Sequence, residues 1–567
     1  MVLSWRVVSL LVGAISVPWR HGGGGAHALV LSSYPGYCAK DMDLNSIPSL
    51  DDSVQASFGG GVSLDDVELL QVHAMIRHGA RGPYTKPRCW EGYAESWDCN
   101  VTEVVSPSLS ADDGGVGATG LFRKLYDAYP SDNALSGTCM AGQLLDEGYE
   151  QEQANGRHLR DAYLCGNPSC LAAANATAKD LQDSGALYLR SDDQQRTVMS
   201  GQILTASMLN VSGAVLDWHT GDDQYDYLAP NLETCPRLGE LSGEALTDPS
   251  WIEVTSSWEN AALNVSMTSV WEQEVVWWDV LDCLMTTACT GRELPEELTD
   301  EVFAAAVDFS TQKMVQEASF NDAAYGKLAM AKLTREIRER MAGAMNGTSP
   351  LKFVLLSGHD TTFIPFMAAV APSAWDGTWP RYATLASIEL LRIGGGGSES
   401  GEFYFRFVYN GQVLRLEGCD QDICAIEAFL DATQFSVDIQ DDTDHCCCKN
   451  MTQASVDNYE QGKEDGAGAA AETPAPTVLD ETNVAESALA PGSSNNGSGL
   501  VTGGGTAATS GEGDGSDAAA AAAGGAVGIA FACFVIGAIF GGVPALMYFR
   551  SFRYEQMRGG GHSYEMT

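Results

Sequence analysis

The stretch VELLQVHAMIRHGARGP, residues 67–83, decides the fold. Its first ten residues are dense in apolar side chains, which predicts a strand buried on both faces of a sheet. This strand runs directly into a small basic loop that contains Arg77, His78 and Arg81. In open α/β sheets, ligands bind just beyond the carboxyl ends of the strands. The loop therefore indicates an anion-binding site at a strand end.

Two later segments repeat this form. ALYLRSDD, residues 186–193, is a short apolar run that ends at Arg190, and LKFVLLSGHDTTF, residues 351–363, ends at His359 and Asp360. Residues 196–209 show apolar side chains at helical spacing, and Asn410-Gly411 predicts a β-hairpin. Strands that alternate with helices predict an α/β fold with a mostly parallel sheet flanked by helices.

The side chains at these strand ends suit phosphate chemistry. Planar guanidinium groups bind tetrahedral oxyanions through paired hydrogen bonds, so three arginines around one small space indicate phosphate. A histidine among arginines is held neutral, and neutral imidazole can attack phosphorus. We therefore predict His78 as the nucleophile, Asp360 as the general acid, and His359 as a donor to the phosphate.

RHGARGP resembles the R-H-G-x-R-x-P signature of the histidine acid phosphatase family, and SGHDTT resembles its downstream His-Asp motif. LRSDDQQRTVMSGQ is similar to the family segment that supplies a third phosphate-binding arginine. The resemblance extends loosely from Val67 to Phe429. It implies an α/β core with a mostly helical cap, a metal-free and cofactor-free mechanism, a phosphohistidine on His78, and a leaving group protonated by Asp360. It also implies that phosphate is held by Arg77, Arg81, Arg190 and His359.

One position departs from the family pattern. The family usually has threonine after Arg-Ser, whereas Asp192 follows Ser191 here. A carboxylate that points into the pocket would oppose phosphate; it could instead point away or cap the helix that begins near Arg196. The His-Ala-Glu variant of phytase-like members is absent, which favours a monoester phosphatase of the acid phosphatase type.

The chain divides into five predicted parts. Residues 1–28 resemble a signal peptide, with an apolar core and an Ala-His-Ala cleavage site. Residues 29–430 form the catalytic domain, in which the tryptophan-rich segment 217–336 is a helical cap. Residues 431–523 are acidic and then rich in Gly, Ala, Ser and Thr, which predicts a disordered lumenal stalk. Residues 524–549 are long and apolar enough for one transmembrane helix, and 550–567 form a cytoplasmic tail.

This organisation predicts a single-pass type I membrane protein. Fourteen of the 15 cysteines precede the predicted span, which indicates disulfides; Cys165/Cys170 and Cys419/Cys424 are plausible local pairs. Cysteines 446–448 are expected in membrane-proximal disulfides, with pairing between chains left open. A tyrosine-based motif at 554–557 favours endosomes or lysosomes, and a plain tail favours the plasma membrane. Glycosylation sequons, all before the span, begin at Asn100, Asn175, Asn210, Asn264, Asn346, Asn450 and Asn496.

The sequence thus predicts a metal-independent acid phosphatase that acts on a small phosphate monoester. The net charge of −43 excludes nucleic acid as a partner, because phosphate backbones need basic surfaces. A homodimer is left open. The alternative function is a receptor or adhesion ectodomain built on a catalytically degenerate phosphatase fold, since a glycosylated ectodomain, a stalk and a span also describe receptors.

Overall fold

The computed structural model describes residues 37–439 and Cys446, apart from 85–88, 91–92, 94, 100–125, 128, 130–132, 223–224, 272–274, 296–297 and 395–400. The predicted signal peptide, transmembrane helix (524–549) and tail, and nearly all of the stalk, lie outside these residues. Within them, none of the helices has the length and apolar character that a membrane crossing needs.

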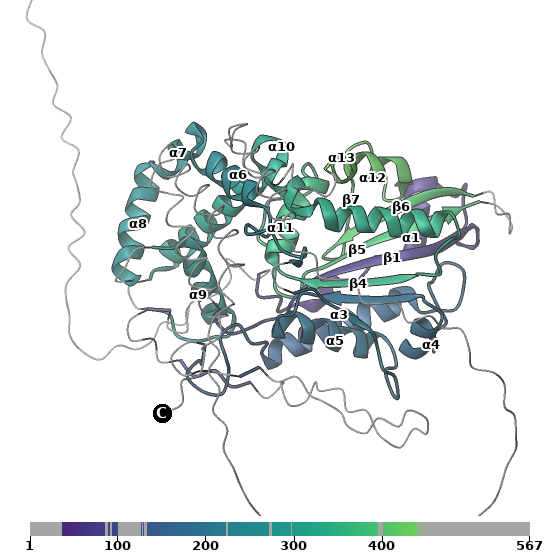
Figure 1. Ribbon diagram of the computed structural model, residues 1–567, viewed down its shortest axis with the longest axis horizontal. Helices are drawn as coiled ribbons and strands as arrows, with labels where there is room; N and C mark the ends of the chain where they lie inside the picture. The colour runs from purple at the N-terminus through teal and green to yellow at the C-terminus, as the bar shows by residue number, and fades with distance from the viewer. Residues whose placement is uncertain are drawn as a thin grey trace, which may run out of the picture. The chain divides into compact units, whose positions relative to one another are not determined.

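Eight strands form one sheet (Figure 1), in the order β3-β2-β4-β1-β5-β6-β7, with β8 beside β6. They are β1 (Val67–Arg77), β2 (Leu187–Ser191), β3 (Trp218–His219), β4 (Phe353–Gly358), β5 (Leu385–Ile393), β6 (Glu402–Tyr409), β7 (Gln412–Leu414) and β8 (Cys424–Ala425). The four strands from β3 to β1 are parallel, whereas β5 to β8 pair antiparallel. The predicted mostly parallel sheet is therefore wrong for half of the sheet, which is mixed.

The antiparallel half follows from local turn chemistry. Asn410 and Gly411 have φ values of 46° and 74° and connect β6 to β7. Positive φ at both central residues is what a tight hairpin turn requires, and such a turn joins antiparallel neighbours. The predicted hairpin is confirmed.

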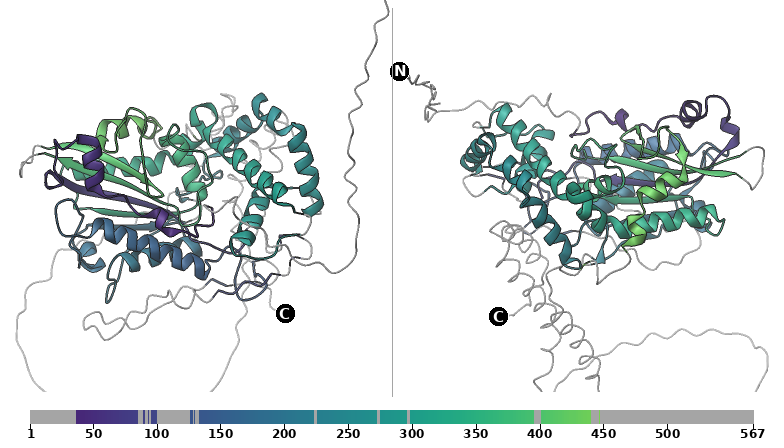
Figure 2. Two further views of the ribbon diagram at one scale, coloured as in Figure 1. Left: turned by 180° about the vertical axis from the view of Figure 1, so that it is seen from behind. Right: turned by 90° about the horizontal axis from the view of Figure 1, so that it is seen from above.

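Helices cover both faces of the sheet (Figures 1 and 2). Strand β1 is buried on both sides, as predicted: Val72, Ala74 and Ile76 pack with residues of α3 and α5, and Met75 packs with residues of α10 and α11. The helices of this part are α1 (Leu50–Phe58), α3 (Asp146–Tyr163), α4 (Ala178–Asp183), α5 (Gln195–Met208), α11 (Asp360–Val370), α12 (Ile426–Ala432) and α13 (Phe435–Asp438), with short 3-10 turns at Met42–Asn45 and Leu64–Asp66.

A helical cap lies beyond the ends of the strands, on the side where β1 and β4 have their carboxyl ends (Figure 1). It contains α6 (Pro236–Leu246), α7 (Pro249–Thr255), α8 (Trp258–Trp271), α9 (Trp277–Cys289) and the first part of α10 (Asp300–Met345). The predicted limits, 217–336, differ at both ends. Residues 218–219 form β3 of the sheet, and α10 is interrupted by non-helical residues 320–323, after which Met330, Leu333 and Ile337 join the core of the sheet. Helical periodicity is the same on both sides of this break, so sequence spacing could not place it.

Six disulfides connect described cysteines. Cys165–Cys170 and Cys419–Cys424 are confirmed. The others are Cys38–Cys289, Cys89–Cys283, Cys99–Cys139 and Cys235–Cys446. Cys446, for which pairing between chains was left open, bonds within the chain to Cys235, the residue that precedes α6. This many disulfides fits an oxidising, extracellular or lumenal compartment.

The folded domain extends beyond the predicted boundary at residue 430. Helices α12 and α13 end at Ala432 and Asp438, and Arg335 donates to the carbonyl oxygens of Ser436 and Ile439. Residues 431–439, predicted as the start of the stalk, therefore belong to the folded domain. Of the predicted glycosylation sites, Asn175, Asn210, Asn264 and Asn346 are exposed; Asn100, Asn450 and Asn496 lie outside the described residues.

Candidate active site

The carboxyl ends of three parallel strands meet at one point. In register, Arg77 of β1 lies opposite Gly358 of β4, and Ser191 of β2 lies opposite Ser357. The chain leaves these strands as His78, Asp192 and His359. The three strand ends therefore converge, as the sequence led us to expect.

His78 is fixed at the end of β1 by its backbone and its ring. Its amide donates to the Gly358 carbonyl (3.0 Å), and Nδ1 of its ring lies 2.8 Å from the Gly79 carbonyl oxygen. A carbonyl only accepts, so Nδ1 carries the proton and Nε2 keeps its lone pair. Burial and the charges of Arg196, Arg77, Arg81 and His359 hold the pKa of His78 well below its ordinary value.

Close backbone packing sets the path of this loop. A Cβ on Gly79 would lie 2.5 Å from the carbonyl oxygen of Gly148 in α3, closer than any side chain allows. Gly79 therefore lets the loop pack directly against the backbone of α3, and this contact fixes the position of the neighbouring His78.

Two predicted arginines lie beside His78. Arg77 is fully buried, donates to the Pro380 carbonyl oxygen (2.5 Å), and forms an ion pair with Asp360 (2.7 Å). Arg81 forms an ion pair with Asp282 of α9. The Nε groups of both arginines are buried without a partner in the described part of the chain. Unpaired buried donors are costly, so they indicate an anionic ligand here.

A further arginine, Arg196, acts on His78, and the sequence did not single it out; the predicted phosphate-binding Arg190 is engaged elsewhere in this structure. Arg190 forms an ion pair with Asp226 (2.8 Å) and stacks on Tyr227. Arg196, by contrast, is the charge that lowers the pKa of His78 most; it stacks on Tyr84 and makes no hydrogen bond or ion pair to any described residue.

A physical signal for Arg196 was present in the sequence. Arg196 is the second residue of α5, where the positive end of the helix dipole disfavours a cation. A buried arginine in a first turn needs a nearby anion.

The side chain of Asp192 pairs with His359 and Thr197, and it does not cap α5. Its Oδ2 lies 2.6 Å from Nε2 of His359, and its Oδ1 accepts from Thr197. Burial raises the pKa of Asp192, but His359, Thr197 and Arg196 outweigh burial, so this pKa lies below its ordinary value. An ionised carboxylate therefore holds the imidazole of His359, whose ring centre is 5.4 Å from that of His78.

Asp360 is the first residue of α11, directly after His359. Its Oδ2 accepts from Arg77 and from Nε1 of Trp379 (3.1 Å), and its Oδ1 accepts from the Thr361 amide. Burial raises its pKa, but Arg77, Arg81 and His359 outweigh that effect, so the pKa of Asp360 lies below its ordinary value in the free enzyme.

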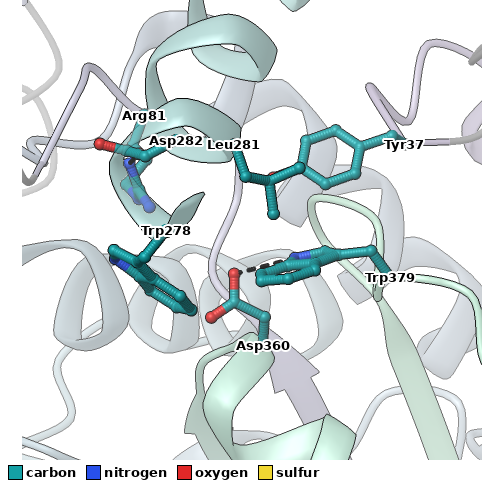
Figure 3. Close-up of a pocket in the computed structure, with 7 residues that line it drawn as sticks. All are labelled: Tyr37, Arg81, Trp278, Leu281, Asp282, Asp360 and Trp379. Carbon is teal, nitrogen blue, oxygen red and sulfur yellow. Dashed lines mark hydrogen bonds and ion pairs between the residues drawn. The ribbon is translucent and has the colours of Figure 1, made fainter. Parts of the chain in front are cut away.

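A small cavity adjoins Asp360 and Arg81, between the strand ends and the cap (Figure 3). Several of its walls come from the N-terminal segment, the cap and a late loop, which lie far from the strand-end motifs in the sequence. The lining residues are Tyr37, Arg81, Trp278, Leu281, Asp282, Asp360 and Trp379.

The sequence of this chain is similar to those of known proteins. The family model "Histidine phosphatase superfamily (branch 2)" matches residues 68–410. Counting factor 60 of Dictyostelium discoideum is 27% identical over 402 residues, which cover 69% of this chain and 91% of that protein. Human lysophosphatidic acid phosphatase type 6 is 25% identical over 409 residues, or 70% and 89% of the two chains. A Hafnia alvei phytase structure in complex with myo-inositol hexakis sulphate covers 68% of this chain and 99% of its own, at 14% identity and a TM-score of 0.40.

Proposed function

The chain belongs to the histidine phosphatase superfamily, branch 2, and is an acid phosphatase; we propose that it hydrolyses small phosphate monoesters through a phosphohistidine on His78. The observation that carries the proposal is the ring of His78, with Nδ1–H directed to the Gly79 carbonyl oxygen and Nε2 left unprotonated. A fixed tautomer with a free lone pair is the state that a nucleophile requires.

In the first half-reaction, Nε2 of His78 forms a bond to phosphorus while the bond from phosphorus to the ester oxygen breaks. Asp360 gives its proton to the departing alkoxide, which leaves as an alcohol. In the second half-reaction, Asp360 takes a proton from water, the water oxygen attacks phosphorus, and the bond to Nε2 breaks. Inorganic phosphate leaves, and both side chains return to their starting states.

The arginines stabilise the charge on the transferring group. Unpaired Nε–H groups on Arg77, Arg81 and Arg196 are available to the equatorial oxygens. His359, held by Asp192, adds a donor on the strand β4 side. Asp360 is paired with Arg77 in the free enzyme. A bound phosphate dianion competes for Arg77 and disfavours a charged Asp360, which promotes protonation of the acid.

Cellular placement follows from the sequence. We place the catalytic domain outside the cytosol, on a stalk and a single membrane span, in lysosomes or endosomes or at the plasma membrane. The disulfides and the exposed sequons support this placement. No described feature of the site favours the receptor alternative, because each side chain that the chemistry needs is present.

The test is an activity assay on the glycosylated ectodomain, residues 29–447, secreted from eukaryotic cells. We expect hydrolysis of 4-nitrophenyl phosphate at acid pH that persists in a chelator and is lost in His78→Ala. Asp360→Asn should slow alkyl phosphates more than nitrophenyl phosphate, since nitrophenolate leaves without a proton. Full activity of a folded His78→Ala variant would refute the proposal.

A further inference from the structure

The loop between α11 and β5 holds the two residues at the end of β1. The side chain of Arg77 donates to the Pro380 carbonyl oxygen (2.5 Å), and its amide donates to the Thr384 carbonyl oxygen (3.0 Å). The carbonyl oxygen of His78 accepts from the amide of Ala383 (3.1 Å). Because the His78 amide is bound to the end of β4, the backbone of the nucleophile is held on one side by β4 and on the other by this loop.

Ala383 has a backbone conformation that alanine disfavours. Its φ is 50°, in the left-handed region, where the Cβ of an L-residue crowds the following carbonyl oxygen. The left-handed conformation is less populated than the right-handed one by a factor of roughly 5 to 30. Such residues persist where the surrounding structure imposes the conformation. The contacts that hold Ala383 therefore decide whether its amide reaches the carbonyl oxygen of His78.

Two buried asparagines supply these contacts. Nδ2 of Asn45 and Nδ2 of Asn155 both donate to the Ala383 carbonyl oxygen, at 2.8 and 3.0 Å. Nδ2 of Asn45 also donates to Oδ1 of Asn155 (2.7 Å), so the two amide groups hold each other. All three residues are 0% exposed. Asn45 ends a 3-10 turn near the start of the domain and Asn155 lies in α3, so segments distant in the sequence meet at one backbone carbonyl.

Both asparagines are themselves held from behind. Oδ1 of Asn45 accepts from Arg381, and Nδ2 of Asn155 donates to Oε2 of Glu152 (3.0 Å), one turn earlier in α3. Burial raises the pKa of Glu152 well above its ordinary value, so this carboxyl group is neutral. The proposed mechanism uses none of these four side chains, and yet they converge on the loop that holds its nucleophile.

We propose that Asn45 and Asn155 are positioning residues, which hold Ala383 in its left-handed conformation and thereby fix His78 where Nε2 can attack phosphorus. The proposal rests on the proposed function, since it concerns the same nucleophile. A displacement of about 1 Å at a reacting atom can lower a rate about 100-fold, because attack requires alignment. The hydrogen bond from Ala383 to His78 is the step through which this buried network acts on the rate.

The experiment asks whether a change of backbone preference at Ala383 compensates for the loss of an amide. The full chain, expressed in eukaryotic cells, would carry Asn155→Leu, Ala383→Gly or both. Leucine keeps the branched shape of asparagine but donates no hydrogen bond, and glycine adopts the left-handed region without a Cβ penalty. We would measure kcat/KM for 4-nitrophenyl phosphate, which reports the phosphorylation of His78, together with the free energy of unfolding.

Tyr163→Phe is the matched control, because it removes a buried hydrogen bond made from the same helix. The hydroxyl of Tyr163 donates to Oε1 of Glu389 (2.7 Å), which lies in β5 and not in the loop. We expect this variant to lower the free energy of unfolding and to keep kcat/KM within about 2-fold of the wild type. The control therefore separates a loss of stability from a loss of positioning.

We expect Asn155→Leu to lower kcat/KM by roughly 10- to 100-fold. The same substitution made in the Ala383→Gly background should have an effect smaller by a factor of roughly 5 or more, because glycine needs the amides less. A folded Asn155→Leu enzyme within about 2-fold of the wild type would overturn the proposal, as would a loss that Ala383→Gly leaves unchanged. Either result would leave the phosphatase function intact.

If Asn155→Leu fails to fold, Asn45→Ser takes its place, since it removes the other donor to the same carbonyl oxygen. Failure of both variants to fold would show that the two amides serve the stability of the domain, and it would overturn the proposal. Absence of turnover by the wild type would instead overturn the proposed function, and this inference with it.

Discussion

The hydrogen bond between Asp192 and His359 gives a sharp prediction. This carboxylate stands where the family usually has threonine, and it is buried, ionised and 2.6 Å from the imidazole. If His359 stabilises the transferring phosphoryl group, Asp192 acts as a positioning residue that keeps the ring oriented. Removing its charge should then weaken transition-state stabilisation without altering the nucleophile.

The magnitude follows from the type of bond. A charge-assisted hydrogen bond contributes about 1.5–3 kcal/mol and a neutral one about 0.5–1.5 kcal/mol. Asp192→Asn keeps the size and loses the charge, so it should cost about 1–1.5 kcal/mol, or roughly 5- to 15-fold in kcat/KM. Asp192→Ala leaves His359 without this partner and should cost roughly 10- to 150-fold.

The assay is steady-state hydrolysis of 4-nitrophenyl phosphate from pH 3 to 8, together with inhibition by inorganic phosphate. Asp193→Asn is the matched control, because Asp193 is the next residue and is exposed. We expect both Asp192 variants to lose activity across this pH range, Asp192→Ala more than Asp192→Asn, because the imidazole of His359 loses the carboxylate that orients it. A folded Asp192→Ala enzyme within 2-fold of wild type across this range would refute the reasoning.

Three further predictions concern the site and its support. Arg196→Ala should raise the inhibition constant of inorganic phosphate by roughly 10- to 150-fold, whereas Arg190→Ala should leave it within about 3-fold; equal effects would contradict the assignment. The pKa of Asp360 lies below its ordinary value, so the acid form is scarce near neutral pH and becomes more populated as the pH falls. Hydrolysis of an alkyl phosphate should therefore rise from pH 7 to 4, and Asp360→Asn should flatten this slope; an unchanged slope would exclude this acid. The disulfide Cys89–Cys283 spans a sequence separation of 194, so its replacement by serines should lower the free energy of unfolding by up to about 5 kcal/mol, measured by denaturant titration; an unchanged value would show that the bond adds no stability.

The parallel half of the sheet and the meeting of strand ends could be predicted from sequence, because buried strands and strand-end motifs are local signals. His78, Arg77, Arg81, His359 and Asp360 are adjacent in the sequence to the strands that position them. Once the strands are in register, the positions of these five side chains are largely determined.

Other features depend on packing between distant segments. The surroundings of Arg190 depend on Asp226, which pairs with it from a loop 36 residues away. The partnership of Asp192 with His359 joins positions 167 residues apart. Asp282 belongs to a cap helix whose periodicity shows only that it is amphipathic. Contacts between such distant positions cannot be predicted from a local sequence pattern.

The most direct test of the central claim is to trap the phosphoenzyme. The ectodomain would be mixed with 4-nitrophenyl phosphate for milliseconds, quenched in alkali to preserve phosphohistidine, digested and sequenced by mass spectrometry. We predict one added phosphate on the peptide that contains His78, on the imidazole itself, and none in His78→Ala. Steady turnover with no phosphate on His78 at any quench time, or a phosphate on another residue, would contradict the account.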